Sequence, residues 1–175
     1  MARARHEASW TDEDAVVKGR VGRNRAWVLL ALFAALAVLS TVTFNRFMNF
    51  QDVTYQLRSC TAPLTQESTW DEVQAAACDP VPAAGAELTL WAASHERPAD
   101  ATTGDSWTFE DVPVNTAQTS MEIRLPQAAR SVVLAEPDNE VVRRELRPDV
   151  SDRRWTANVG GRGPTTYWVL VTPAG

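Results

Sequence analysis

Residues that commonly perform catalysis are few in this chain and far apart. Histidine occurs twice, as His6 and His95, among 175 residues. A single histidine inside a polar run such as residues 94–98 is typical of a solvated loop and makes a poor general base without a partner. The sequence contains no G-x-S-x-G, S-x-x-K, H-E-x-x-H or P-loop motif. We therefore predict a protein that is not an enzyme.

Pairs of carboxylates could also indicate an enzyme, since two carboxylates that face one cleft can hydrolyse glycosidic bonds. Neighbouring acids occur at Glu110–Asp111 and at Asp138–Glu140, and a solvated turn is the expected setting for both pairs. A calcium site at 138–140 would have too few ligands, so we predict no metal and no cofactor. The residues whose convergence in one pocket would indicate a hydrolase are His95, Glu96, Glu110, Asp111 and Asp138.

The two cysteines, Cys60 and Cys78, bracket a predicted short helix. Thr69 to Glu72 fits a capping box, and Pro80 prevents the helix from continuing. Both cysteines lie on the predicted outer side of a membrane, where disulfides persist, and their spacing is not a C-x-x-C redox motif. A metal site would need more ligands nearby. We predict a Cys60–Cys78 disulfide that stabilises the fold by roughly 3 kcal/mol.

Tryptophans are the remaining feature with binding potential. Five of the seven lie in residues 70–168, and strand alternation places Trp107 among inward-facing residues. Trp91 and Trp168 fall out of phase with the apolar residues of their strands, and exposed aromatic rings mark protein or glycan contacts. The predicted binding face comprises Trp91, Trp168 and Trp155. The alternative is that both faces of these strands are covered.

Residues 26–45 carry no formal charge and include ten Leu, Val or Phe residues. Twenty helical residues span about 30 Å, the thickness of the hydrocarbon core of a bilayer. A buried helix of a soluble core is rarely apolar on every side. A cleaved signal peptide would have a shorter leader and a shorter apolar run than this chain. The segment is therefore predicted to be an uncleaved transmembrane helix, with the lipid bilayer as a partner.

The orientation follows from the flanking charges. Lys18 and three arginines precede the apolar run, whereas Arg46 alone follows it closely. The positive-inside rule then keeps residues 1–25 in the cytoplasm as a basic tail and places residues 46–175 outside the plasma membrane. The net charges agree, at +2 for residues 1–26 and −7 for the rest. This acidic balance also argues against nucleic acid as a partner.

Residues 46–175 are numerous enough to form one domain, and their apolar residues alternate with a period of two, as in half-buried strands. Strands are predicted at 53–58, 87–92, 107–114, 121–125, 131–136, 140–146, 155–159 and 165–172. Proline, glycine and asparagine turns separate them, and 132–146 is the clearest hairpin. These features predict an antiparallel, Ig-like or FN3-like β-sandwich of seven or eight strands with one short helix.

Taken together, these features favour a non-catalytic, single-pass membrane protein whose exported domain binds another membrane or envelope protein, as an accessory subunit of an envelope complex. Tethering supports this prediction because it raises the local concentration of the domain at the membrane. A cell-wall or glycan-binding module that uses exposed tryptophans is the alternative. An envelope hydrolase is the third possibility, and it requires two of the titratable side chains named above to meet in one pocket.

Overall fold

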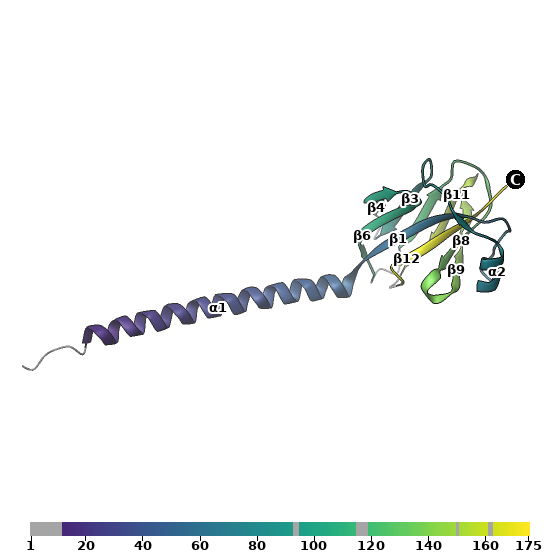
Figure 1. Ribbon diagram of the computed structural model, residues 1–175. Coiled ribbons are helices and arrows are strands. Elements are labelled where there is room, and N and C mark those ends of the chain that lie inside the picture. The colour runs from purple at the N-terminus through teal and green to yellow at the C-terminus, as the bar shows by residue number, and fades with distance from the viewer. Residues whose placement is uncertain (1–11, 93–94, 115–118, 150, 161–162) are drawn as a thin grey trace, which may run out of the picture. The chain divides into compact units, whose positions relative to one another are not determined.

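One long helix, α1 (Asp12–Asn49), precedes a domain built mainly of strands (Figure 1). The computed structural model describes residues 12–92, 95–114, 119–149, 151–160 and 163–175, with side chains from residue 25 onward. Within α1, the 25 residues Arg25–Asn49 are long and apolar enough to cross a membrane. At 1.5 Å per residue they measure about 38 Å, more than the roughly 30 Å that the hydrocarbon core requires.

The surface of this stretch suits a lipid environment. Large apolar side chains are exposed all along it, from Trp27 to Phe47, and no residue of its apolar 18-residue window is buried. The Thr41 hydroxyl donates a hydrogen bond to the Ala37 carbonyl oxygen at 2.8 Å, and the Thr43 hydroxyl donates to that of Leu39. These bonds satisfy both hydroxyls within the helix. The prediction of an N-terminal helix able to span a membrane is thus confirmed, while residues 1–11 of the predicted tail lie outside the described residues.

The chain divides into two compact units, residues 1–45 and residues 46–175. No residue separates α1 from the first strand, because α1 ends at Asn49 and β1 (Phe50–Ser59) begins at the next residue. Within the second unit, Arg46 Nε lies 2.7 Å from Asp111 Oδ1. The Asn49 carbonyl oxygen accepts a hydrogen bond of 2.9 Å from the Val114 amide. Residues 46–49, the last four of α1, therefore belong to the second unit by their contacts as well as by the division of the chain.

Two sheets form this domain in the described residues. The larger sheet contains β1, β2 (Asp79–Pro80), β5 (Ala101–Thr103), β6 (Ser106–Pro113), β8 (Ala129–Glu136), β9 (Val141–Glu145) and β12 (Thr166–Pro173), in the order β5-β6-β1-β12-β8-β9 with β2 also paired to β1. The smaller sheet contains β3 (Glu87–Ala92), β4 (His95–Pro98), β7 (Ser120–Arg124), β10 (Arg147–Asp149) and β11 (Ser151–Asn158), in the order β10-β11-β7-β3-β4.

The two sheets share one hydrophobic core. Phe109 and Val169 of the larger sheet are fully buried, and they belong to the same cluster as Leu90 and Ile123 of the smaller sheet. Each of these side chains contributes about 1.5–3 kcal/mol by leaving water. Trp107 is 2% exposed, so its predicted inward orientation is confirmed.

The prediction of a mainly β domain with one short helix is confirmed. Two details of the prediction are wrong. First, β1 pairs with β12 in parallel, so the domain is not wholly antiparallel. Second, twelve strands are present in the described residues, because β2, β4, β5 and β10 contain only two to four residues each. Segments so short show no measurable alternation. The predicted hairpin at 132–146 is present as the antiparallel pair β8–β9.

A loop closed by the predicted disulfide covers the face of the larger sheet that points away from the shared core. Cys60 and Cys78 are bonded, with their Cα atoms 4.0 Å apart. Between them lies α2 (Trp70–Ala75), which begins with the predicted capping box of Thr69 and Glu72. Figure 1 shows α2 beside β8 and β9. This loop and the sheet form a second core of buried residues, Cys60, Leu64, Val73, Ala76, Val133, Ala135 and Leu170.

Candidate functional site

A cavity of ligand size lies where the chain passes from one sheet to the other. β9 is an edge strand of the larger sheet, and β10 is an edge strand of the smaller sheet. Only Leu146 separates them, and it is buried at 1% exposure. The chain is thus fixed by a core side chain at this crossing, and the flanking residues 145 and 147 are exposed. The crossing opens a groove between β9 and the end of β11.

This groove, which we call the crossing groove, has a volume of about 490 Å³, within the usual range of ligand sites, about 300–1,000 Å³. It is lined by Gln66, Ser120, Arg144, Glu145, Arg147, Thr156, Ala157 and Asn158. A smaller cavity of about 90 Å³ adjoins it, since Arg144 and Asn158 line both. Six of these eight residues carry a hydroxyl, amide or guanidinium group, so the groove suits a ligand that makes hydrogen bonds.

The two arginines of the groove differ from neighbouring arginines in their partners. Arg143 Nε lies 2.8 Å from Glu136 Oε1, and Arg154 contacts Glu122 at 2.7 Å. In contrast, neither Arg144 nor Arg147 forms an ion pair or a side-chain hydrogen bond with any described residue. Each guanidinium presents five N–H donors in a plane. Two such residues lining one groove favour an anionic ligand, and Glu145 is the one acidic residue of the lining.

A tyrosine lines the smaller cavity. Burial and, to a smaller extent, the negative charge of Glu136 raise the pKa of the Tyr167 hydroxyl to about 12, against a lowering effect of Arg143. The Tyr167 ring stacks on the Tyr55 ring at a centroid distance of 5.3 Å. A raised pKa means that the hydroxyl stays protonated at physiological pH and is able to donate a hydrogen bond.

A second hollow is mainly apolar. It has a volume of about 220 Å³ and is lined by Leu57, Ser59, Val81, Pro82, Ala86, Leu125, Pro126, Gln127, Ala128, Val171 and Pro173. These residues come from β1 and β12 of the larger sheet and from the connections at 81–86 and 125–128. The hollow offers little charge and few donors, so it can hold an apolar side chain but provides no means of orienting a ligand.

The structure separates the three tryptophans of the predicted binding face. Trp91 on β3 is 36% exposed, in agreement with its alternation. Trp168 on β12 is only partly exposed, because its ring stacks on Trp70 at 5.5 Å and lies 3.8 Å below the Arg58 guanidinium carbon. The Arg58 guanidinium also donates to the Cys78 carbonyl oxygen at 3.1 Å. Trp168 is therefore covered in part, by a ring and a guanidinium group from other elements.

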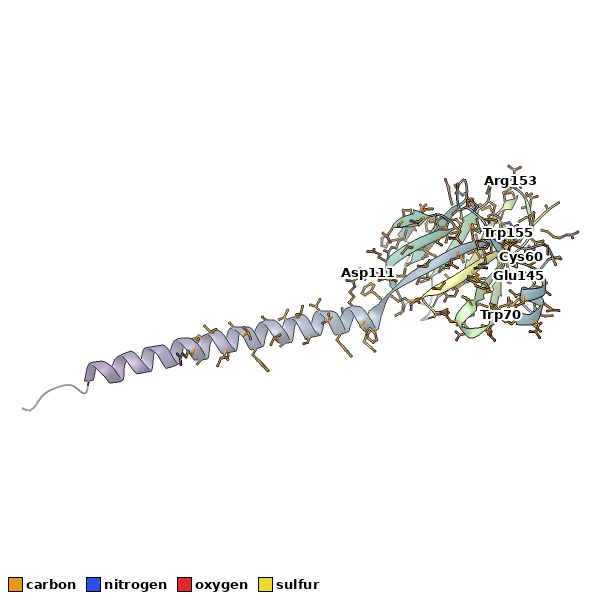
Figure 2. All side chains as sticks on the ribbon, in the orientation of Figure 1. Cys60, Trp70, Asp111, Glu145, Arg153 and Trp155 are labelled. Atoms are coloured by element: carbon orange, nitrogen blue, oxygen red, sulfur yellow. A yellow bond between two sulfur atoms is a disulfide. The ribbon has the colours of Figure 1, made fainter. Side chains whose placement is uncertain are left out.

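The prediction that Trp155 belongs to an exposed binding face is wrong. Its side chain is 4% exposed and belongs to the shared core, and its indole N–H donates to the Asp152 carbonyl oxygen at 2.9 Å. A ring enclosed in this way cannot stack on an external ligand. Because Trp155 (labelled in Figure 2) is buried, the three tryptophans do not form one exposed surface.

The residues that would have indicated a hydrolase are also dispersed. His95 and Glu96 lie on β4, which corrects the prediction of a loop there, and Asp138 lies in the short 3₁₀ helix Pro137–Asn139. None of the five lines the crossing groove, the smaller cavity beside it or the apolar hollow. No cluster of three or more potential metal ligands occurs in the described part of the chain.

Glu110 and Asp111 instead form part of a polar network at a bulge. Asp111 adopts a positive φ of 50°, and its amide donates to Asp52 Oδ1 at 2.8 Å. Arg97 donates to the carbonyl oxygens of both Glu110 and Asp111, at 2.7 and 2.8 Å. These contacts hold the bulge opposite the register shift of β1 between Gln51 and Val53.

The crossing groove was not predicted from the sequence, although the charged residues of one predicted strand indicate an exposed strand edge there. The predicted strand 140–146 contains Arg143, Arg144 and Glu145 in succession, so charges fall on both of its faces. Such a strand is typical of a sheet edge. Comparisons with protein-family models, curated proteins and solved structures found no match for this chain.

Proposed function

We propose that this chain is a non-catalytic, single-pass protein of the plasma membrane whose strand domain binds another protein, as an accessory subunit of an envelope complex. In this proposal residues 1–25 stay in the cytoplasm and residues 46–175 lie outside. The domain would be a sandwich of the Ig-like or FN3-like kind, a proposal supported by its two sheets and their shared core.

The observation that supports binding is the crossing groove. Its volume of about 490 Å³ suits a ligand, and it is lined by Arg144 and Arg147, whose charges are not neutralised by described residues. Charged groups left open in this way set specificity and association rate when a complementary partner arrives. Attachment to a membrane supports the same function by raising the effective concentration for a membrane partner.

A glycan-binding function has weaker support. Sugar rings bind to exposed aromatic faces, and of the three predicted tryptophans only Trp91 is well exposed, at 36%. One isolated ring gives little affinity or specificity. We therefore prefer a protein partner.

Orientation is tested by placing an epitope after Gly175 and treating cells stripped of their wall with a protease. The proposal predicts that the epitope is removed while the membrane remains intact. An epitope that survives until detergent is added would place the domain on the cytoplasmic side and overturn the proposed location.

Partner binding is tested by purifying the full chain in mild detergent. The wild-type chain should retain a partner protein. The double variant Arg144→Ala/Arg147→Ala should lose most of it, because both cationic groups of the groove are removed. Arg153→Ala is the matched control, since Arg153 is exposed and does not line the groove, and Figure 2 shows it away from Glu145. A chain that emerges without partners from several extractions would contradict the proposal.

A further inference from the structure

We propose that the crossing groove receives an extended, acidic peptide segment of the partner, which adds to the domain as a further strand. The inference rests on the proposed function, because it names the part of the partner that is bound. Two independent observations support it: the unpaired strand edges beside the groove and the unbalanced positive charge within it.

The first observation concerns β9. It pairs with β8 through four residue pairs, from Val133–Glu145 to Glu136–Val141, and no described strand pairs with its other side. Its backbone N–H and C=O groups on that side are therefore available to another strand. A peptide that binds there gains main-chain hydrogen bonds whatever its side chains are.

The end of β11 provides a second unpaired edge. β10 pairs with β11 only as far as the pair Arg147–Thr156. The next two residues of β11, Ala157 and Asn158, pair on one side with β7, opposite Met121 and Ser120. On the other side they face the groove, which they line. The groove thus lies between two strand edges that diverge from the crossing at Leu146, and an extended backbone fits between such edges better than a compact ligand does.

The second observation concerns charge. Arg144 and Arg147 line the groove and have no ionic partner among the described residues. Carboxylates bind guanidinium groups with two parallel hydrogen bonds, so an acidic peptide satisfies both arginines. Glu145 disfavours a peptide with carboxylates at every position and favours one in which acidic and uncharged residues alternate.

The same charges argue against a second copy of this chain as the occupant. Antiparallel pairing of β9 with a second β9 in the register that places Arg144 opposite Arg144 would bring two like charges together, and like charges directly opposite each other are destabilising. The sequence of this edge therefore disfavours self-association while it remains open to a strand of opposite charge.

The proposal is tested with the full chain in detergent micelles and fluorescent eight-residue peptides, measured by anisotropy. The first peptide alternates Val and Glu, the second alternates Val and Lys, and the third is the Val–Glu peptide with every second backbone amide N-methylated. We expect the Val–Glu peptide to bind at least tenfold more tightly than either of the others. The lysine peptide tests charge, and the N-methylated peptide tests strand addition without a change in charge.

Variants locate the binding. Arg144→Ala/Arg147→Ala should weaken binding of the Val–Glu peptide about tenfold, since it removes two exposed ion pairs, and Arg153→Ala should change it less than twofold. A thermal midpoint equal to that of the wild-type chain shows that the double variant is folded. Equal binding of the methylated and unmethylated peptides would overturn strand addition. Tighter binding of a glycerol-phosphate oligomer than of the Val–Glu peptide would overturn the peptide assignment in favour of an anionic wall polymer.

Failure of this inference differs from failure of the proposed function. If a partner is retained in detergent by the double variant as well as by the wild-type chain, protein binding stands but the groove is not its site. If no partner is retained by any version of the chain, the proposed function itself is wrong.

Discussion

The outer faces of the two sheets of this domain differ in polarity and in how far they are covered. Over β8 and β12 the outer face of the larger sheet is apolar and covered, because Val133, Ala135 and Leu170 pack under the disulfide loop and α2. The outer face of the smaller sheet is polar and open. There, Glu122 binds both Arg124, at 3.0 Å, and Arg154, at 2.7 Å.

The ionic contacts on the smaller sheet extend across four strands. Arg124 also lies 3.8 Å from Glu87 on β3, and Arg154 lies 3.3 Å from Asp149 on β10. Opposite charges thus alternate across β3, β7, β11 and β10, and such cross-strand pairs stabilise a sheet modestly. Hydrophobic cover therefore stabilises the larger sheet from outside, whereas ion pairs between a buried carboxylate and partly exposed arginines stabilise the smaller sheet. The following substitutions test this difference, from the largest expected effect to the smallest.

Loss of the disulfide should have the largest effect. Cys60→Ser/Cys78→Ser frees the ends of the loop that covers the larger sheet, and the chain-entropy model gives a cost of about 3 kcal/mol. Urea unfolding in mild detergent, followed by tryptophan fluorescence, measures this cost. An unchanged unfolding midpoint would mean that the loop contributes no net stability as a cover.

The tryptophans provide a matched pair across the two sheets. Trp168→Ala removes a ring held between Trp70 and Arg58, and we expect a cost of about 2 kcal/mol from lost packing and cation–π contact. Trp91→Ala on β3 removes a ring that is 36% exposed and should cost less than about 1 kcal/mol. The same unfolding measurement compares them, and equal costs would remove the distinction between the two faces.

Glu122 tests the ionic face through pH. Burial raises the pKa of its carboxyl, but hydrogen bonds and charge from Arg154 and Arg124 outweigh burial and lower the pKa below its ordinary 4.5. A lowered pKa in the folded state stabilises the domain above pH 4.5, and this stabilisation is lost as the pH falls through the folded pKa. We expect Glu122→Gln to cost about 1 kcal/mol near pH 7 and nothing at pH values below the folded pKa. Glu145→Gln is the control, and a pH-independent cost for Glu122→Gln would contradict the account.

The smallest effect on stability is expected in the crossing groove. Arg144→Ala/Arg147→Ala removes two exposed side chains that form no ion pair with described residues, so the free energy of unfolding should change by less than about 0.5 kcal/mol. Urea unfolding near neutral pH measures it. A loss of about 2 kcal/mol or more would show that these arginines support the fold and would weaken their assignment to binding.

Much of this fold could be predicted from local patterns. The eight predicted strands all correspond to observed strands, and the capping box at Thr69 and the Cys60–Cys78 bond are present. These features depend on residues close together in sequence or on the presence of only two cysteines. Each is therefore visible without knowledge of the tertiary structure.

The remainder depends on contacts between distant segments. The cover of Trp168 could not be predicted because Trp70, which provides it, lies 98 residues earlier in the chain. Alternation places a ring on one face of a strand but does not show whether a loop covers that face. Parallel pairing of β1 with β12 and the crossing at Leu146 escape prediction for the same reason, and the crossing is what creates the groove.

The central claim, that a protein partner occupies the crossing groove, is tested most directly by site-specific photo-crosslinking in intact cells. A photoreactive amino acid replaces Asn158, which lines the groove, or Arg153, which is exposed elsewhere on β11. We predict one major protein adduct from position 158, little or none from position 153, and loss of the adduct when Arg144 and Arg147 are both changed to alanine. Absence of any protein adduct at position 158, or equal adducts at both positions, would contradict the claim.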